Sequence, residues 1–171
     1  MGSVVDRRVV PLSSDRPLPP ALSGDFRIER FLLGRSDADG VFQDFTGRIR
    51  RRFAIALEGR AENDVLVLTE QFLFDDGETD QRVWRIERLA SGDYAATADD
   101  MIGTAHGGVR GGVLRWSYLF SLQLGARRLR VRFHDTFVKL SDDVLLNTAR
   151  VCKFGFEIGR TTIVFRRRTP T

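Results

Sequence analysis

Apolar and polar residues alternate in short runs along most of the chain after residue 40. This pattern is typical of β-strands, because successive side chains of a strand point to opposite faces. Turns rich in Gly, Asp or Asn end the runs, and no segment of helical length separates them, so each strand is expected to pair antiparallel with the next. The runs are FAIALEG, VLVLTEQFLF, QRVWRIERL, GVLRWSYLFSLQL, RRLRVRFHDTFVKL, DVLLNTARV and RTTIVFRRR.

A sheet of so many sequential strands has unpaired edges unless it closes on itself. We therefore predict an all-β fold, a single antiparallel up-and-down barrel of about ten strands from near Val41 to near Arg167. Two of these strands are expected to be short and to lie around Ile102 and Gly103.

The segment before the strands predicts a short helix, Asp25–Leu33, in the run DFRIERFLLG. Asp25 is a candidate N-cap, and Gly34 is a natural stop. We expect this helix to cover one end of the barrel and the following RSDADG to form a loop. Residues 1–24 contain several prolines and serines and are expected to be a flexible N-terminal segment, which leaves residues 25–168 as the barrel domain.

Strand parity predicts which side chains face the interior. Three of them are ionisable, namely Glu70, Arg82 and Asp135. The aromatic members of the inward set are Trp84, Trp116, Tyr118, Phe120, Phe133 and Phe137. A charge on an inner wall is costly unless it is paired or orients a bound polar group, so these residues form a candidate ligand-binding site. The alternatives are a structural ion pair without a ligand, or a bulge that turns one charge outward.

Charge adds a second candidate surface. The formal net charge is +4, and the basic residues are nearly all arginine, since Lys139 and Lys153 are the only lysines. The runs RIRRRF, ARRLRVRF and FRRR fit either the solvated outer face of strands or a surface that attracts an anionic membrane. They lack the aromatic–basic interleaving of single-strand binders, so we expect no nucleic-acid partner.

No apolar run reaches the roughly 18 residues that span a bilayer. The first 24 residues contain no hydrophobic segment of the secretory type, and Cys152 is the only cysteine, so no internal disulfide can form. These features predict a cytoplasmic location.

Several segments together resemble a family of bacterial proteins of unknown function, DUF3833. They are FQDFTGRIRRRF, DDGETDQRVWRI, YAATADDMIGTAHGGV, LRWSYLF, RVRFHDTF, and KFGFEIG followed by VFRR. The resemblance as a whole extends from about Phe31 to Arg167. Many members of that family look like lipoproteins with an acylated cysteine, which this sequence lacks. The strand pattern is similar in architecture to the calycins, which include the lipocalins and fatty-acid-binding proteins. The resemblance implies a barrel that can hold a hydrophobic ligand, and it implies no reaction.

The acidic and histidine motifs do not predict a metal site. DDGETD lacks the ligand spacing of a calcium-binding hand, and an acidic hairpin with Gly77 in a left-handed conformation is expected instead. The pair Asp99 and Asp100 is expected to cap a turn. His106, His134 and Cys152 are too few for a structural zinc site. Parity places His134 beside arginines, and glycines flank His106, so neither is expected to bind haem. We predict no metal and no cofactor.

No motif of a serine hydrolase, a dinucleotide-binding protein or a nucleoside-triphosphate-binding protein is present. Cys152 is expected to be a small buried residue. In KFGFEIG, Lys153 is a candidate cation at the barrel mouth, and we expect Phe154 and Phe156 to plug that end.

Three functions fit these features. The first is binding of a fatty acid or related lipid inside the barrel, with Arg82 against its acid group. The second is a cofactor-independent isomerase or cyclase that acts on a lipid-like or polyketide-like substrate, with Glu70 or Asp135 as general base. The third is binding of an anionic membrane surface through the arginine-rich strands. The sequence predicts neither the ligand nor the oligomeric state.

Overall fold

The computed structural model describes residues 25–124 and 127–168, so the flexible segment expected over residues 1–24 lies outside the described part of the chain. These residues form one short helix and ten strands. The elements are α1 (Ile28–Leu32), β1 (Gly34–Asp44), β2 (Ile49–Glu62), β3 (Val65–Phe74), β4 (Thr79–Arg88), β5 (Tyr94–Ala98), β6 (Met101–Arg110), β7 (Val113–Leu124), β8 (Arg127–Lys139), β9 (Val144–Lys153) and β10 (Phe156–Arg167).

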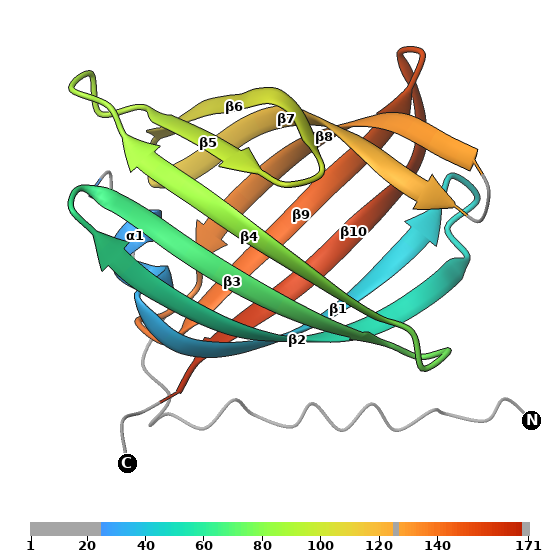
Figure 1. Ribbon diagram of the computed structural model, residues 1–171, viewed down its shortest axis with the longest axis horizontal. Helices are drawn as coiled ribbons and strands as arrows, with labels where there is room; N and C mark the ends of the chain where they lie inside the picture. The colour runs from blue at the N-terminus through green and yellow to red at the C-terminus, as the bar shows by residue number, and fades with distance from the viewer. Residues whose placement is uncertain (1–24, 125–126, 169–171) are drawn as a thin grey trace, which may run out of the picture.

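The strands form a closed antiparallel barrel in which each strand pairs with its neighbours in sequence (Figure 1). Closure comes from β1 and β10, which pair from Ser36 opposite Arg167 to Asp44 opposite Gly159. This pairing satisfies the backbone groups of both terminal strands and leaves the sheet without an edge. The predicted all-β, up-and-down barrel of about ten strands is confirmed.

One end of the barrel is sealed by α1 and by Phe26, which lies two residues before it. Phe26, Ile28, Phe31 and Leu32 are all buried there. A hydrogen bond fixes the helix to the wall, since the Tyr94 hydroxyl donates to a Glu29 carboxylate oxygen over 2.5 Å. Apolar burial, rather than helix propensity, therefore holds this five-residue helix in place.

The opposite end admits solvent, and we call it the open end. It is formed by the last residues of the odd-numbered strands β1, β3, β5, β7 and β9 and the first residues of the even-numbered ones. Inward-facing side chains at this end are only half-buried, whereas those near α1 are buried. The half-buried apolar residues that face inward here include Phe42, Phe53, Phe72, Phe74, Met101, Leu122, Leu129 and Phe133.

The start of the barrel differs from the prediction. The helix is shorter than Asp25–Leu33, its N-cap is Arg27 and not Asp25, and RSDADG is strand, not loop. The sequence of β1 shows no alternation of large apolar and polar residues. Its inward side chains are small, and its outward ones include carboxylates that form ion pairs. Asp37 binds Arg168 at 2.5 Å. The barrel therefore begins at Gly34, seven residues before Val41.

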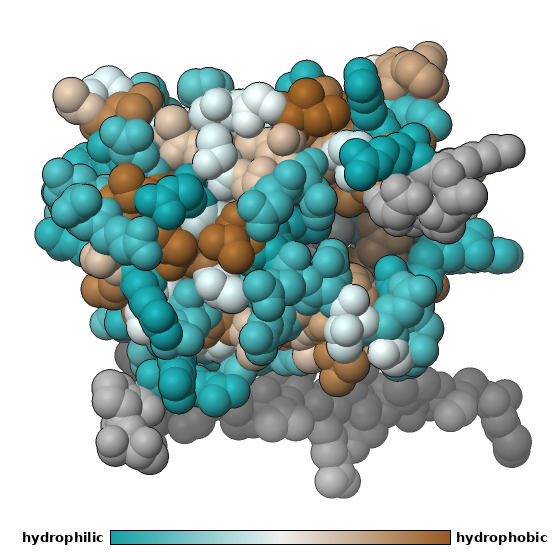
Figure 2. All heavy atoms as spheres, viewed as in Figure 1, coloured by the Kyte–Doolittle hydropathy of each residue, from teal (hydrophilic) through white to brown (hydrophobic). Residues whose placement is uncertain are grey.

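The outer wall is largely hydrophilic on the side seen in Figure 2, with scattered hydrophobic residues. Ion pairs join strands on the outer wall, for example Arg166 of β10 with Asp39 of β1 at 3.0 Å, and Arg85 of β4 with Glu62 of β2, across β3, at 3.4 Å. Such exposed pairs each contribute little to stability, and they show that many arginines cover the sheet exterior.

Candidate functional site

Most of the residues assigned to the interior by parity lie there. The carboxylates of Glu70 and Asp135 are buried, with 8% and 6% of their surface exposed, and the Arg82 side chain is 14% exposed. Trp84, Trp116, Tyr118, Phe120 and Phe137 are buried, and Phe133 is half-buried. The predicted strand register is therefore confirmed at each of these positions, because a slip of one residue would turn them all outward.

Asp135 is held by two aromatic donors. Its Oδ2 accepts hydrogen bonds from Trp116 Nε1 at 3.0 Å and from the Tyr118 hydroxyl at 2.9 Å. Its Oδ1 has no partner among the described residues. Burial raises the pKa of Asp135 to about 7, although both hydrogen bonds favour its charged form. The pKa of Tyr118 also lies well above its ordinary value, because of burial and the neighbouring Asp135.

Glu70 has one aromatic donor. Trp84 Nε1 donates to Glu70 Oε2 over 2.9 Å. Burial raises the pKa of Glu70, while the positive charge of Arg82 and the bond from Trp84 oppose that shift. Glu70 and Arg82 occupy directly opposed positions on β3 and β4.

Aromatic rings join the two carboxylates into one cluster. Trp84 stacks on Trp116 with ring centroids 5.9 Å apart, and it meets Tyr118 edge-on at 5.3 Å. Asp135 also interacts electrostatically with Glu70 and Arg82. We name this group the polar belt, and its members are Glu70, Arg82, Trp84, Trp116, Tyr118 and Asp135.

Within the polar belt, Arg82 lies on the side of the open end. Its guanidinium carbon is 4.4 Å from the ring centroid of Phe120 and 5.4 Å from that of Phe72. The carboxylate of Asp80 is 4.0 Å away, and the Arg82 Nε has no hydrogen-bond partner among the described residues. Aromatic faces therefore surround this cation, and its hydrogen-bonding capacity is incompletely used.

Phenylalanines line the interior from Arg82 outward. Phe53, Phe72 and Phe74 contact one another with ring centroids 5.8–6.0 Å apart. Arg51 covers Phe74, with its guanidinium carbon 3.6 Å from the ring centroid. This layer forms an apolar part of the inner wall between Arg82 and the open end.

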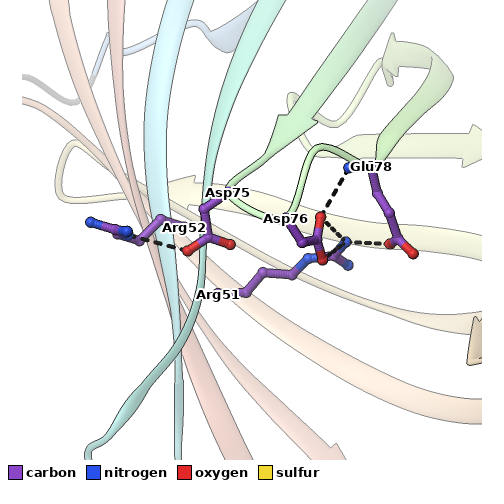
Figure 3. Close-up of polar contacts among 5 residues, drawn as sticks. All are labelled: Arg51, Arg52, Asp75, Asp76 and Glu78. Atoms are coloured by element: carbon purple, nitrogen blue, oxygen red, sulfur yellow. Dashed lines mark hydrogen bonds and ion pairs between the residues drawn. The ribbon is translucent and has the colours of Figure 1, made fainter.

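Ion pairs fix the β3–β4 hairpin at this end (Figure 3). Arg51 binds Asp76 at 2.8 Å and also contacts Glu78, while Arg52 binds Asp75 at 3.2 Å. The segment DDGETD thus forms the expected acidic hairpin, with Gly77 at φ 84°. The carboxylates of Asp75, Asp76 and Glu78 bind arginines of β2 instead of collecting at one point.

Two buried polar residues were not predicted. Ser36 and Asn147 face inward on β1 and β9, and Ser36 Oγ and Asn147 Nδ2 have no partner among the described residues. The alternation of Leu145, Asn147 and Ala149 was the available signal for the asparagine.

Both histidines lie on the outer wall. His106, Ser117, His134, Arg150 and Arg160 form one cross-strand row from β6 to β10. They help to line a groove of about 790 Å³. Partial burial and the nearby arginines lower the pKa of His134, so its imidazole is neutral near pH 7. His134 lies beside arginines as expected, whereas His106 is on a strand and not in a loop.

The predicted plug at the open end is wrong. Phe154 is 88% exposed and Phe156 is 76% exposed, on the hairpin between β9 and β10. Gly155 lets the chain turn so tightly that Phe154 projects into solvent instead of folding back over the barrel. Cys152 is only partly buried, because it faces outward on β9.

In residues 25–124 and 127–168, no three His, Cys, Asp or Glu side chains are grouped so that they could hold a metal ion. No helix of this part of the chain is long and apolar enough to cross a membrane.

Comparison with known proteins identifies the fold and the family. An S-type phycobiliprotein lyase, CPES from Guillardia theta, has a similar structure with a TM-score of 0.58 and 8% sequence identity. The alignment covers 86% of this chain and 96% of the lyase. The sequence matches no curated protein. The family model of DUF3833, described as a protein of unknown function, matches residues 21–167. The chain therefore belongs to the DUF3833 family.

Proposed function

We propose that the barrel binds an amphipathic small molecule with an acid group, a fatty acid or related lipid, which enters from the open end. The acid group lies against Arg82, and the hydrocarbon part lies among the inward-facing phenylalanines. The observation that carries this proposal is the largely buried Arg82 guanidinium, whose Nε has no partner in the described part of the chain.

A ligand carboxylate would be a better partner for Arg82 than the neighbouring carboxylates of the protein are. Glu70 is the nearest opposed carboxylate in the ladder, yet burial raises its pKa and Trp84 supplies its hydrogen bond. Asp80 is at the limit of an ion pair, at 4.0 Å. A planar carboxylate can instead accept two parallel hydrogen bonds from a guanidinium, and such pairs are strong where water is scarce.

The phenylalanine layer supports the hydrophobic half of the ligand. Burial of each methylene group there contributes about 0.8 kcal/mol, so a chain of several carbons contributes enough to hold a ligand. The likeness to a phycobiliprotein lyase shows the fold alone, and it adds a bilin as a second acidic ligand to test.

The test compares a long-chain fatty acid with the alcohol of the same length, by isothermal titration. Arg82→Met should weaken binding of the acid about tenfold or more and change binding of the alcohol less than twofold. Arg85→Met is the matched control, because Arg85 lies on the same strand but on the outer wall. Equal loss for acid and alcohol would make Arg82 structural. Absence of acid binding to the wild type would remove the proposed function.

Asp135 favours a second candidate function, proton abstraction from a polyketide-like or lipid-like substrate without a cofactor. Its pKa of about 7 and its unpartnered Oδ1 suit a general base.

The probe is a long-chain 2,4-diketone in heavy water. Asp135 would take a proton from the carbon between the carbonyls, and the carbanion would then accept a deuteron. Deuterium incorporation that Asp135→Asn abolishes and Glu70→Gln retains would support this role. Equal incorporation with and without the protein would exclude it for this substrate class.

A further inference from the structure

Exposed hydrophobic side chains gather at the open end. Among the described residues, eight large hydrophobic side chains are exposed, and six of them lie at or near this end. The six are Phe45, Ile49, Leu73, Ile102, Phe154 and Phe156. The other two, Leu33 and Leu140, lie at the α1 end. Isolated exposed hydrophobic residues are ordinary, but this distribution between the two ends is uneven.

The most exposed of them occupy two neighbouring hairpin tips. Phe45 is in the β1–β2 turn and is 77% exposed, and Phe154 is in the β9–β10 turn. Because β1 pairs with β10, with Asp44 opposite Gly159, the two turns project from adjacent positions on the rim. The β9–β10 tip stands out from the barrel in Figure 1 and is hydrophobic in Figure 2.

The backbone of the β9–β10 tip favours this exposure. Phe154 has φ 51°, a left-handed conformation that is uncommon for a bulky side chain. A polar residue or glycine would occupy this turn position with less strain and better solvation. A phenylalanine at this position costs both backbone strain and exposure of an apolar ring to water. Its presence there indicates a contact that compensates for these two costs.

Positive charge accompanies the two tips. The Lys153 ammonium lies 5.2 Å from the centroid of the Phe154 ring. Arg132 faces outward on β8 opposite Cys152, and neither its guanidinium nor that of Arg48 has a carboxylate partner among the described residues. The acidic groups of these hairpins are already occupied, since Asp44 binds Arg50 and Glu157 binds Arg160, each at 2.5 Å.

We propose that the open end docks on an anionic lipid bilayer, with Phe45, Phe154 and Phe156 inserted at the headgroup level and Lys153 and the unpaired arginines against lipid phosphates. Aromatic side chains with flanking cations are suited to this interface. The hydrophobic residues occupy separate projecting turns instead of one continuous patch, so a bilayer surface fits them better than the compact face of a protein does. This inference rests on the proposed function in one respect: a docked barrel faces the membrane with the end through which the lipid ligand enters.

Co-sedimentation with vesicles tests the docking. One set of vesicles contains phosphatidylglycerol and phosphatidylcholine, and the other contains phosphatidylcholine alone. The wild type should bind the anionic vesicles at least tenfold more tightly. The double variant Phe45→Ser/Phe154→Ser should lose about tenfold in that affinity, whereas Leu33→Ser/Leu140→Ser at the other end should bind as the wild type does. All four positions are exposed, and matching thermal melts would show that both variants fold.

Three results would overturn docking: no binding of the wild type to anionic vesicles, equal loss in both double variants, or wild-type dimers in solution that Phe45→Ser/Phe154→Ser dissociates. The last would assign the tips to a second copy of the chain. Arg82→Met separates docking from ligand binding, because it should bind vesicles normally while it loses affinity for free fatty acid. Normal vesicle binding by a protein that takes up no fatty acid would reject the proposed function and retain docking.

Discussion

Arg82 and Glu70 face each other across the β3–β4 ladder, yet the Glu70 carboxylate receives its hydrogen bond from Trp84 and not from the guanidinium. Burial raises the pKa of Glu70 and so reduces its tendency to neutralise the arginine. The Arg82 guanidinium instead contacts the rings of Phe72 and Phe120. This arrangement leaves the Arg82 guanidinium without a hydrogen bond from Glu70, as the proposed binding of an acid group at Arg82 requires.

Asp135→Asn should reduce the pH dependence of stability. Burial raises the pKa of Asp135 from 3.8 to about 7, so the folded state holds this proton more tightly than the unfolded chain does. The free energy of unfolding therefore falls as the pH rises from about 4 to about 7, by up to roughly 4 kcal/mol from this group. Asparagine keeps an oxygen acceptor for Trp116 and Tyr118 but has no proton to lose.

Urea denaturation at several pH values measures this effect. The control is Asp64→Asn, in the exposed β2–β3 turn, which should keep the slope of the wild type. An undiminished slope in Asp135→Asn would show that Asp135 is ionised in the folded protein throughout this range.

Tyr118→Phe should raise the pKa of Asp135 further. The Tyr118 hydroxyl donates to Asp135 Oδ2 and so favours the carboxylate, while phenylalanine keeps the ring that stacks on Phe133. Carbon-13 NMR of the side-chain carboxyl group should report a higher titration midpoint. Tyr94→Phe makes the same change near α1, where the hydroxyl binds Glu29, and should leave that midpoint unaltered. A lower midpoint in Tyr118→Phe would contradict the hydrogen bond.

Phe31→Ala should destabilise the barrel by about 3–5 kcal/mol, because Phe31 fills the end that α1 seals and a cavity would remain. Leu33→Ala, two residues further along the chain and 46% exposed, should cost far less. Chemical denaturation compares the two, and similar losses in both variants would mean that α1 does not seal the core.

The middle of the chain was predictable because its strands alternate large apolar and polar side chains. Alternation around Trp116 and around Asp135 sufficed to place both inside. The first strand was missed because its inward residues are small. At Gly40 any added side chain would meet the Phe53 ring, so the sequence there shows polar residues without an apolar face. Pairing with β10, distant in sequence, decides its conformation.

The candidate site was predictable in membership but not in its contacts. Parity brought Glu70, Arg82 and Asp135 to one wall, whereas the donors that bind each carboxylate depend on side-chain rotamers and barrel curvature. The prediction for Phe154 was wrong because an apolar residue next to a glycine is also typical of a turn that packs against the core. The hairpin geometry that turns it outward is not encoded by alternation.

Energy transfer from tryptophan to bound cis-parinaric acid tests the central claim most directly. The chain has two tryptophans, Trp84 and Trp116, and both belong to the polar belt. The account predicts saturable transfer that oleic acid displaces, with an affinity about tenfold or more weaker in Arg82→Met and unchanged in Arg85→Met. No saturable transfer to the wild type, or equal affinities in all three proteins, would contradict acid binding at Arg82.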